Sequence, residues 1–487
     1  MKLFPRLLVA VSCVVLPLAA KAQTPVLLTT LPNPTPGAGD SFAWSVAVLG
    51  NDHVLIGAPY DGPTNAGAVY LFGTNGTLLT TFTNPSPAYT IWFGNPDLDG
   101  DLFGIAIAGL GGDRVLIGAP YEGSFWSGRA YLFRVDGTLV TYFDTPSLYG
   151  GGDRFGAAAA VLGNDRLIIS APGYTSDPDI GNAVGVVYLL NTNGNLLATL
   201  NNPVQQQYAE FGFSVAPFGT DRVLVGARNA GAAYLFDTNG ALLTTFTNPA
   251  PATFNYFGHS VASVGTERVF IGAPQADEGA EDAGVAYLFS TNGALLTTIT
   301  NPSPALGDSF GARVAVLGSD RIVVSSIYDD AAATNSGAAY VFSASGTLLN
   351  TITNPTPAAS DAFGARVAAL GNDRVIIGAT YDDLGATDAG TAYLFSIPPP
   401  PTPPSITIQR TTTNSVVVSW PSAATDFTLQ QNTNGVSSVN WSNVTATIQN
   451  GGTNKTLVVN PTSGNRFYRL SNPYQRPKPG AVSGAPL

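Results

Sequence analysis

The sequence predicts an all-β protein, and three observations support this prediction. The first is composition: of 487 residues, 45% are hydrophobic and only 11% are charged, so the chain can bury a large core. The second is an internal repeat of short β-type segments, and the third is the turn chemistry between these segments. A helix is hard to place anywhere in the repeats.

A phenylalanine, usually followed by glycine, marks seven repeats that begin 46 to 61 residues apart. These residues are Phe42, Phe103, Phe155, Phe211, Phe257, Phe310 and Phe363. Each repeat holds short apolar segments separated by turn residues such as Gly-Asn-Asp and Asn-Gly, which favour hairpins. Seven antiparallel units of about four strands each predict a seven-bladed β-propeller over residues 23–397.

The two ends of the repeat region indicate how the ring closes. The seventh repeat ends at residues 390–401 (GTAYLFSIPPPP) without the fourth segment that the other repeats carry. Residues 26–36 (VLLTTLPNPTP) match that missing segment and precede the first repeat. We therefore expect an N-terminal strand to complete the last blade.

The repeated motifs resemble the FG-GAP repeat of integrin-alpha-type propellers and their bacterial relatives. They are clearest at Phe103-Gly104, at residues 115–120 (VLIGAP) and at residues 130–133 (AYLF), and the resemblance covers about residues 25–397. It implies a propeller that binds ligands on one face. It also implies calcium loops between the first two strands of several blades, formed by alternating acidic residues.

The chain departs from the family at these loops. Each is shortened to a turn with one carboxylate, usually beside an arginine, and calcium needs about six to eight oxygen ligands. The remaining acids are Asp52, Asp113, Asp165, Asp221, Glu267, Asp320 and Asp373. We expect solvated or blade-bridging contacts here, and neither the family's calcium nor any other cofactor.

Asp97, Asp99 and Asp101 alternate in a spacing that a calcium loop can use, although an acidic surface turn is the interpretation that we favour. The only histidines, His53 and His259, stand where other repeats have unrelated residues, and we expect both to be incidental. No Ser-His-Asp or paired-carboxylate motif is evident, so the sequence does not argue for an enzyme.

The segment after the second strand differs most between repeats and often begins with tyrosine and an acid. Its candidate ligand-binding residues are Tyr60, Asp61, Tyr121, Glu122, Trp126, Tyr328, Asp329, Tyr381 and Asp382. Aromatic side chains beside hydrogen-bonding acids suit protein or sugar surfaces. The alternative is that the tyrosines pack on neighbouring blades. The resemblance implies that these loops share one face with the blade-to-blade loops.

Arg313 and Arg366 are further candidates, because the equivalent residues of the innermost strand are small in the other repeats. Those residues are Ser45, Ala106, Ala158, Ser214 and Ser260. Two arginines on adjacent blades could hold an anionic ligand group. The alternative, which we favour, is that they pair with nearby acids such as Asp308 and Asp361.

The chain ends predict export and a second module. Residues 1–22 have the pattern of a secretory signal peptide, which implies a secreted or cell-surface protein. Residues 398–404 form a Pro-rich linker, residues 405–471 resemble a fibronectin type III-like β-sandwich, and residues 472–487 are predicted to be disordered.

The function predicted from these features is non-catalytic binding or adhesion, with an extracellular protein or cell-surface ligand as the partner. Carbohydrate or polysaccharide binding is the second hypothesis, and a propeller hydrolase or lyase is the third. A net charge of -11 without a basic cluster argues against nucleic acid and membrane surfaces, and we expect a monomer.

Overall fold

The computed structural model describes residues 24–62, 65–87, 100–147, 151–175, 183–250, 255–398, 405–412, 415–422, 427–433, 440–459 and 466–471. It divides into two compact units, of which one is Thr24–Pro398 and the other contains the C-terminal strands. The predicted signal peptide, the linker from residue 399, the tail, and the candidates Asp97 and Asp99 lie outside the described residues.

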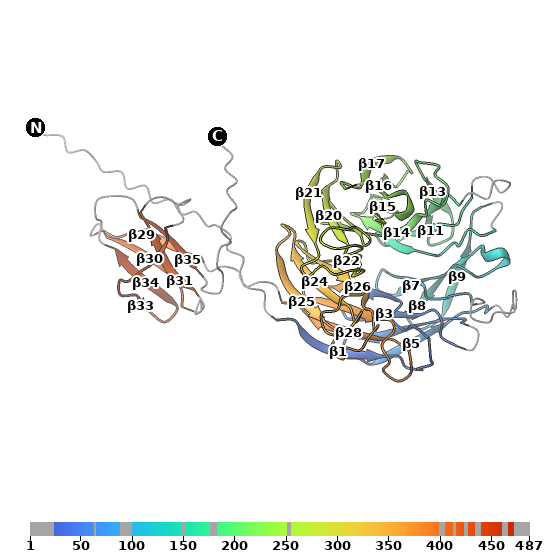
Figure 1. The fold of residues 1–487 in the computed structure, drawn as a ribbon, viewed down its shortest axis with the longest axis horizontal. Helices are drawn as coiled ribbons and strands as arrows, with labels where there is room; N and C mark the ends of the chain where they lie inside the picture. The colour runs from blue at the N-terminus through green and yellow to red at the C-terminus, as the bar shows by residue number, and fades with distance from the viewer. Residues whose placement is uncertain are drawn as a thin grey trace, which may run out of the picture. The chain divides into compact units, whose positions relative to one another are not determined.

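The larger unit consists of seven four-stranded antiparallel sheets, the blades of the predicted propeller (Figure 1). The strands of each blade are given from the innermost outwards. Blade 1 consists of β2 (Ser45–Leu49), β3 (His53–Ala58), β4 (Ala68–Gly73) and β5 (Leu78–Thr83), and blade 2 of β6 (Ala106–Leu110), β7 (Arg114–Ala119), β8 (Arg129–Arg134) and β9 (Leu139–Asp144). Blade 3 consists of β10 (Ala159–Leu162), β11 (Arg166–Ala171), β12 (Val186–Asn191) and β13 (Leu196–Asn201), and blade 4 of β14 (Phe211–Phe218), β15 (Arg222–Ala227), β16 (Ala232–Asp237) and β17 (Leu242–Thr247). Blade 5 consists of β18 (Ser260–Val264), β19 (Arg268–Ala273), β20 (Val285–Ser290) and β21 (Leu295–Thr300), and blade 6 of β22 (Phe310–Leu317), β23 (Arg321–Ser326), β24 (Ala338–Ser343) and β25 (Leu348–Thr353). Blade 7 consists of β26 (Phe363–Leu370), β27 (Arg374–Ala379), β28 (Thr391–Ser396) and the N-terminal strand β1 (Val26–Pro32).

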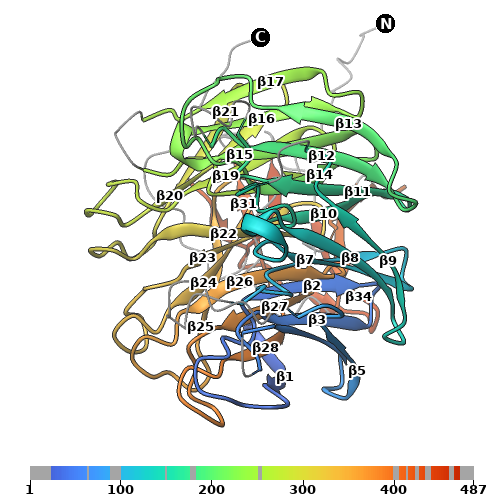
Figure 2. The same ribbon diagram turned by 90° about the vertical axis from the view of Figure 1, so that its right-hand side faces the viewer.

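The N-terminal strand completes the last blade, as the sequence predicts. Strand β1 pairs antiparallel with β28 from Val26 opposite Ser396 to Pro32 opposite Thr391. The two strands lie side by side in both ribbon views (Figures 1 and 2). Each innermost strand contacts that of the next blade, and β26 of blade 7 contacts β2 of blade 1. These contacts run around the whole ring.

The repeated glycines allow adjacent blades to approach closely. A Cβ on Gly118, in the Gly-Ala-Pro motif of blade 2, would lie 2.0 Å from the carbonyl oxygen of Gly156 in the Phe-Gly motif of blade 3. Gly156 itself has a φ of +94°, which favours glycine. The same approach closes the ring, where a Cβ on Gly378 would lie 2.7 Å from the Ala43 oxygen.

Aromatic residues fill the space between the blades. The phenylalanine of each repeat is fully buried, and its ring contacts the tyrosine in the third strand of the same blade. In blade 2, for example, the Phe103 centroid lies 5.7 Å from that of Tyr131 and 6.0 Å from that of Phe133. Edge-to-face contacts at these distances add to the stabilisation from apolar burial.

The turn arginines bridge the blades. Arg166 Nη2 donates to the Thr220 carbonyl at 2.6 Å, and Arg374 Nη2 donates to the Asn51 carbonyl at 2.6 Å across the ring closure. The adjacent acids are exposed, as with Asp165 at 3.8 Å from Arg166. The blade-bridging interpretation of these turns is therefore confirmed.

The smaller unit contains two antiparallel sheets. One is β29 (Thr407–Arg410), β30 (Val416–Pro421), β34 (Asn454–Val459) and β33 (Gln449–Asn450), and the other is β32 (Ser442–Asn443), β31 (Thr428–Asn432) and β35 (Phe467–Ser471). Both sheets contribute to one buried cluster, with Trp420 from β30 and Leu429 from β31. The resemblance to fibronectin type III stays a prediction. None of the helices within the described ranges has the length and apolar character of a membrane span.

Candidate functional site at one end of the central channel

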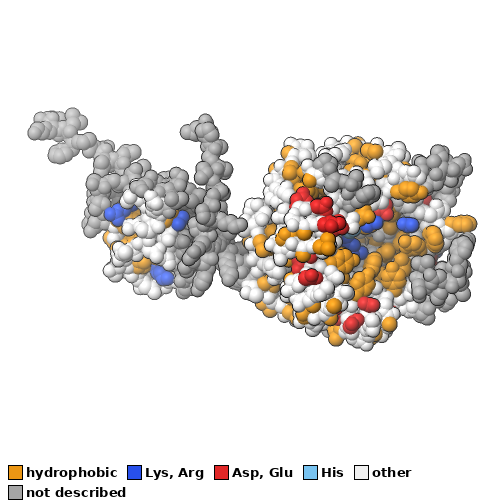
Figure 3. Space-filling model, viewed as in Figure 1, with side chains coloured by type: hydrophobic (Ala, Val, Ile, Leu, Met, Phe, Trp, Pro, Cys, Tyr) orange, Lys and Arg blue, Asp and Glu red, His pale blue; other side chains and the backbone are white. Residues whose placement is uncertain are grey.

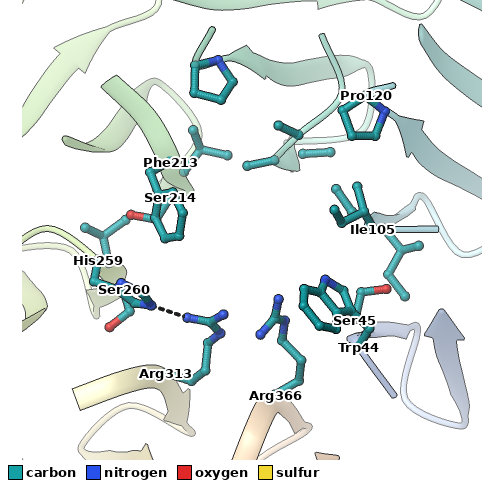
Figure 4. Close-up of a pocket in the computed structure, with 18 of the residues that line it drawn as sticks. Trp44, Ser45, Ile105, Pro120, Phe213, Ser214, His259, Ser260, Arg313 and Arg366 are labelled. Atoms are coloured by element: carbon teal, nitrogen blue, oxygen red, sulfur yellow. Dashed lines mark hydrogen bonds between the residues drawn. The ribbon is translucent and has the colours of Figure 1, made fainter. Parts of the chain in front are cut away.

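A cavity of about 640 Å³ lies where the innermost strands converge (Figure 4). All seven blades contribute to its wall, through residues near the start of the innermost strands and, in blades 2 to 4, through residues that follow the second strands. Trp44 and Ser45 come from blade 1, Phe213 and Ser214 from blade 4, and His259 from blade 5. We call this space the mouth cavity.

The mouth cavity opens on the face where the candidate loops gather. Tyr121 and Arg154 line it, and they belong to a loop after a second strand and a blade-to-blade loop, respectively. The two kinds of loop are hydrogen-bonded to each other: Gly152 N–H donates to the Phe125 carbonyl at 2.6 Å. The expectation that these loops share one face is confirmed for the described residues.

Arg313 and Arg366 project into the mouth cavity from adjacent blades, β22 and β26 (Figure 4). Arg313 Nη1 donates to the Ala312 carbonyl at 2.7 Å, and Arg366 Nη1 donates to the Ala365 carbonyl at 2.7 Å. The Arg366 guanidinium also lies 5.3 Å from the centre of the Trp44 ring, a cation–π distance.

The interpretation that these arginines pair with Asp308 and Asp361 is wrong. Asp308 Oδ2 accepts hydrogen bonds from Asn301 Nδ2 and from Ala305 N–H, both at 2.7 Å. Asp361 Oδ2 likewise accepts from Asn354 Nδ2 at 2.7 Å and from Ala358 N–H at 2.6 Å. Each carboxylate is held by the asparagine that follows the preceding outer strand, and neither forms an ion pair with an arginine in the described parts of the chain.

His259 contacts Arg313, although the sequence suggested an incidental residue. Its Nε2 lies 2.7 Å from Arg313 Nη1. Burial, and next the charge of Arg313, lower the pKa of His259 well below 6.5, so the ring is neutral at pH 7. A guanidinium can only donate, so Nε2 accepts and Nδ1 carries the proton. This Nδ1 is buried and has no partner among the described residues.

The cavity wall is strongly basic. Its charged residues are Arg154, Glu210, Arg228, Arg313 and Arg366, which give a net charge of +3. Burial, and next the charge of Arg228, lower the pKa of Arg313 to about 10; burial, and next Arg313, lower the pKa of Arg366 well below 12.5. Figure 3 shows basic side chains gathered near the centre of the propeller, beside hydrophobic ones.

Aromatic side chains connect the cavity to the surface loops. The Tyr121 ring lies 6.1 Å from that of Trp126, and the Arg154 guanidinium lies 5.7 Å from the Tyr121 centroid. Trp126 is 50% exposed, and Phe125 beside it is 71% exposed. Both belong to the short 3-10 segment η2 (Ser124–Trp126) and have positive φ values of 54° and 57°.

The candidate tyrosines divide between the two interpretations. Tyr60 packs against Trp44 with ring centroids 5.8 Å apart, and burial, then neighbouring Tyr381 and Tyr121, raise its pKa. Tyr328 and Tyr381 are 41% and 37% exposed. Tyr60 is therefore packed on an aromatic ring of its own blade, whereas Tyr328 and Tyr381 expose part of their side chains to solvent.

The acids that follow these tyrosines fasten the loops to the sheets. The tyrosine of the third strand donates to the acid in each case: Tyr131 to Glu122 at 2.6 Å, Tyr340 to Asp329 at 2.6 Å, Tyr393 to Asp382 at 2.7 Å, and Tyr70 to Asp61. Glu122, Asp329 and Asp382 are 3%, 3% and 4% exposed. These three acids lie inside the blades and not on the ligand-accessible surface.

The calcium candidates are only partly described. Asp101 is buried and accepts a hydrogen bond from Asn84 Nδ2 at 2.7 Å. Across the described residues, no group of three or more histidines, cysteines and acids is placed to hold a metal ion.

Residues that shape the cavity and were missed from the sequence include Trp44, Arg154, Glu210, Phe213 and Arg228. The Arg228 guanidinium lies 3.6 Å from the Phe213 centroid and is paired with Glu210. The sequence did contain a signal for Trp44 and Phe213. In blades 1, 4 and 5 the residue directly before the small residue of the innermost strand is large and carries a ring: Trp44, Phe213 and His259.

The fold and this cavity define a seven-bladed β-propeller with a ligand-sized space at one end of its channel. A family model of the FG-GAP repeat matches residues 36–72, 297–342 and 347–395. FG-GAP repeats are therefore present in these three ranges, which confirms the resemblance there. No match was found among curated proteins.

Proposed function

We propose that this is an exported, non-catalytic binding protein that holds an extracellular protein or cell-surface ligand on the face around the mouth cavity. FG-GAP repeats suggest a propeller of a kind commonly used for binding or adhesion. The export half of the proposal depends on the pattern of residues 1–22.

The exposure of Phe125 and Trp126 is the observation that carries the proposal. At 71% and 50%, these are large apolar side chains in a loop that differs in every blade. Trp126 contacts Tyr121, which lines the mouth cavity, so the apolar surface continues into a concave site. A few aromatic side chains beside a cavity are typical of the residues that dominate binding energy.

Other exposed apolar residues follow the repeat itself. The first residues of the outermost strands are exposed in every blade, as with Leu242 at 44% and Leu243 at 50%. Because this feature recurs around the rim, it does not distinguish one blade from another. The rim therefore supplies a matched control for the loop of blade 2.

The test measures binding of the labelled full chain to immobilised extracellular-matrix proteins and to a glycan array. The double variant Phe125→Ser/Trp126→Ser should lose about 10-fold or more in affinity for the protein that binds, because truncated aromatic hot spots cost about 2 kcal/mol or more. Leu242→Ser/Leu243→Ser should bind as the parent does. An equal loss in both variants would contradict the proposal.

Carbohydrate binding is the alternative that the same observation permits, because exposed aromatic rings also suit sugar surfaces. Binding confined to the glycan array, and lost in Phe125→Ser/Trp126→Ser, would favour that alternative over a protein ligand.

A further inference from the structure

Three arginines of the mouth cavity have no carboxylate partner among the described residues: Arg154, which is exposed, and Arg313 and Arg366, which are half-buried. No ion pair in the described parts of the chain includes Arg313 or Arg366. Arg313 and Arg366 are half-buried, and charges withdrawn from water are normally paired, so this arrangement needs an explanation. Arg228, in the same wall, is paired with Glu210.

The guanidinium groups of Arg313 and Arg366 are each held by hydrogen bonds from one nitrogen, Nη1. The hydrogen bonds of Arg313 to Ala312 and His259 both use Nη1, and the hydrogen bond of Arg366 to Ala365 also uses Nη1. The Trp44 ring lies beside the Arg366 guanidinium. For both arginines, Nε and Nη2 have no partner among the described residues and retain their N–H donors.

The charge of the cavity is opposite to that of the chain. The wall carries a net charge of +3, whereas the whole chain carries -11. Low-dielectric walls with one sign of charge concentrate the field within a cleft. An anion is therefore attracted to this cavity and not to the rest of the surface.

We propose that Arg313 and Arg366 bind an oxyanion group (a carboxylate, sulfate or phosphate) of the ligand that occupies the mouth cavity. Guanidinium groups bind such groups through parallel N–H donors, and two guanidiniums on adjacent blades provide donors from two directions (Figure 4). The inference rests on the proposed binding function, whose loop face surrounds the same cavity.

The size of the cavity indicates that the anion is part of a larger molecule. At about 640 Å³ it falls within the range of about 300 to 1,000 Å³ that is usual for small-molecule sites. A bare anion would leave most of this volume empty. A sugar acid, or the acidic end of a longer chain, fits the space better.

Isothermal titration of the full chain with glucuronate and with glucose tests the proposal, since the two sugars differ only at the carboxylate. Sulfate and phosphate are titrated in parallel, with chloride keeping the ionic strength constant. We expect glucuronate to bind at least about 10-fold more tightly than glucose, as charge-assisted hydrogen bonds imply. If sulfate or phosphate bound and glucuronate did not, the oxyanion site would be supported, and the natural ligand would carry a sulfate or phosphate in place of a carboxylate. Failure of all three anions would overturn it.

The variant Arg313→Gln/Arg366→Gln separates binding from folding. It should lose at least about 10-fold in anion affinity while its Tm stays the same or rises, because two half-buried charges without carboxylate partners are removed. Arg166→Gln, on a turn arginine away from the cavity, should leave anion binding unchanged. Unaltered anion binding in the double variant would overturn the proposal. If that variant still bound the matrix protein while Phe125→Ser/Trp126→Ser did not, the proposed function would stand without the oxyanion site.

Discussion

The guanidinium carbon of Arg366, in the last blade, lies 5.3 Å from the centre of the Trp44 ring, at the start of the first blade. This contact spans the junction where the chain closes the propeller, and it also forms part of the mouth cavity wall. Ring closure and the candidate site therefore share residues, and stability and binding can be tested at the same position.

Replacement of Arg366 by methionine should stabilise the protein by about 1 kcal/mol. The arginine is a charge without a carboxylate partner, whereas methionine is neutral and can still pack on Trp44. Arg374→Met is the control in the same blade, because Arg374 donates to the Asn51 carbonyl across the same junction. Arg374→Met should lower the free energy of unfolding, measured with urea, by about 0.5 to 1 kcal/mol. A clear loss of stability in Arg366→Met would show that the guanidinium has a structural partner.

Strand β1 offers a test of closure by the N-terminal segment. Leu31 is fully buried, whereas Leu28 on the same strand is 48% exposed. Leu31→Ala should lower the free energy of unfolding by about 2 to 5 kcal/mol through the cavity that it creates. Leu28→Ala should change it by less than about 0.5 kcal/mol. Equal effects of the two substitutions would contradict closure by β1.

Deletion of residues 23–38 is the larger version of this test. It removes the outermost strand of blade 7 and exposes the edge of β28, so the Tm of the chain should fall sharply. An unchanged melting curve would sink the closure account.

The acids of the tyrosine-acid pairs should matter for stability and not for ligand affinity. Asp382 is buried and accepts hydrogen bonds from Tyr393 at 2.7 Å and Thr391 at 3.1 Å. Asp382→Ala should cost about 1 to 3 kcal/mol, because buried donors lose their acceptor. The neighbouring Asp383 is exposed, and Asp383→Ala should cost less. If the Asp382→Ala protein had normal stability and weakened ligand binding, Asp382 would be a ligand-binding residue and this prediction would be wrong.

Asp308 and Asp361 predict how stability depends on pH. Burial raises the pKa of each from 3.8 to about 6. Between these values the folded state keeps a proton that the unfolded state has released, so stability should fall as pH rises from about 4 to about 6. The expected loss is about 1 to 3 kcal/mol per group.

The double variant Asp308→Asn/Asp361→Asn isolates this effect. Urea unfolding at several pH values should show a flatter profile between about pH 4 and 6, because neither side chain can titrate. An identical slope in the parent and the variant would mean that other groups control stability in this range.

The architecture was predictable because it is encoded seven times. Hairpin turns and β-type segments recur at fixed places in each repeat, and local chemistry determines them. The displaced strand at residues 26–36 could be recognised because it matches the fourth segment of the other repeats. Arg313 and Arg366 could be selected for the same reason: they replace small residues in an otherwise uniform position of the innermost strand.

The partners of these residues could not be predicted in the same way. Asp308 is near Arg313 in sequence, but Asn301 orients its carboxylate elsewhere. His259 reaches Arg313 from the previous blade, and Trp44 reaches Arg366 only after the ring has closed. Such contacts depend on side-chain direction across blades, which a repeat alignment does not contain.

The most direct test of the account is a crystal structure of the full chain grown with glucuronate. We predict that the carboxylate lies between Arg313 and Arg366, with hydrogen bonds from Nε or Nη2, and that the sugar ring extends toward Tyr121 and Trp126. Glucuronate bound only on the rim or on the opposite face, with the mouth cavity holding solvent, would contradict the account.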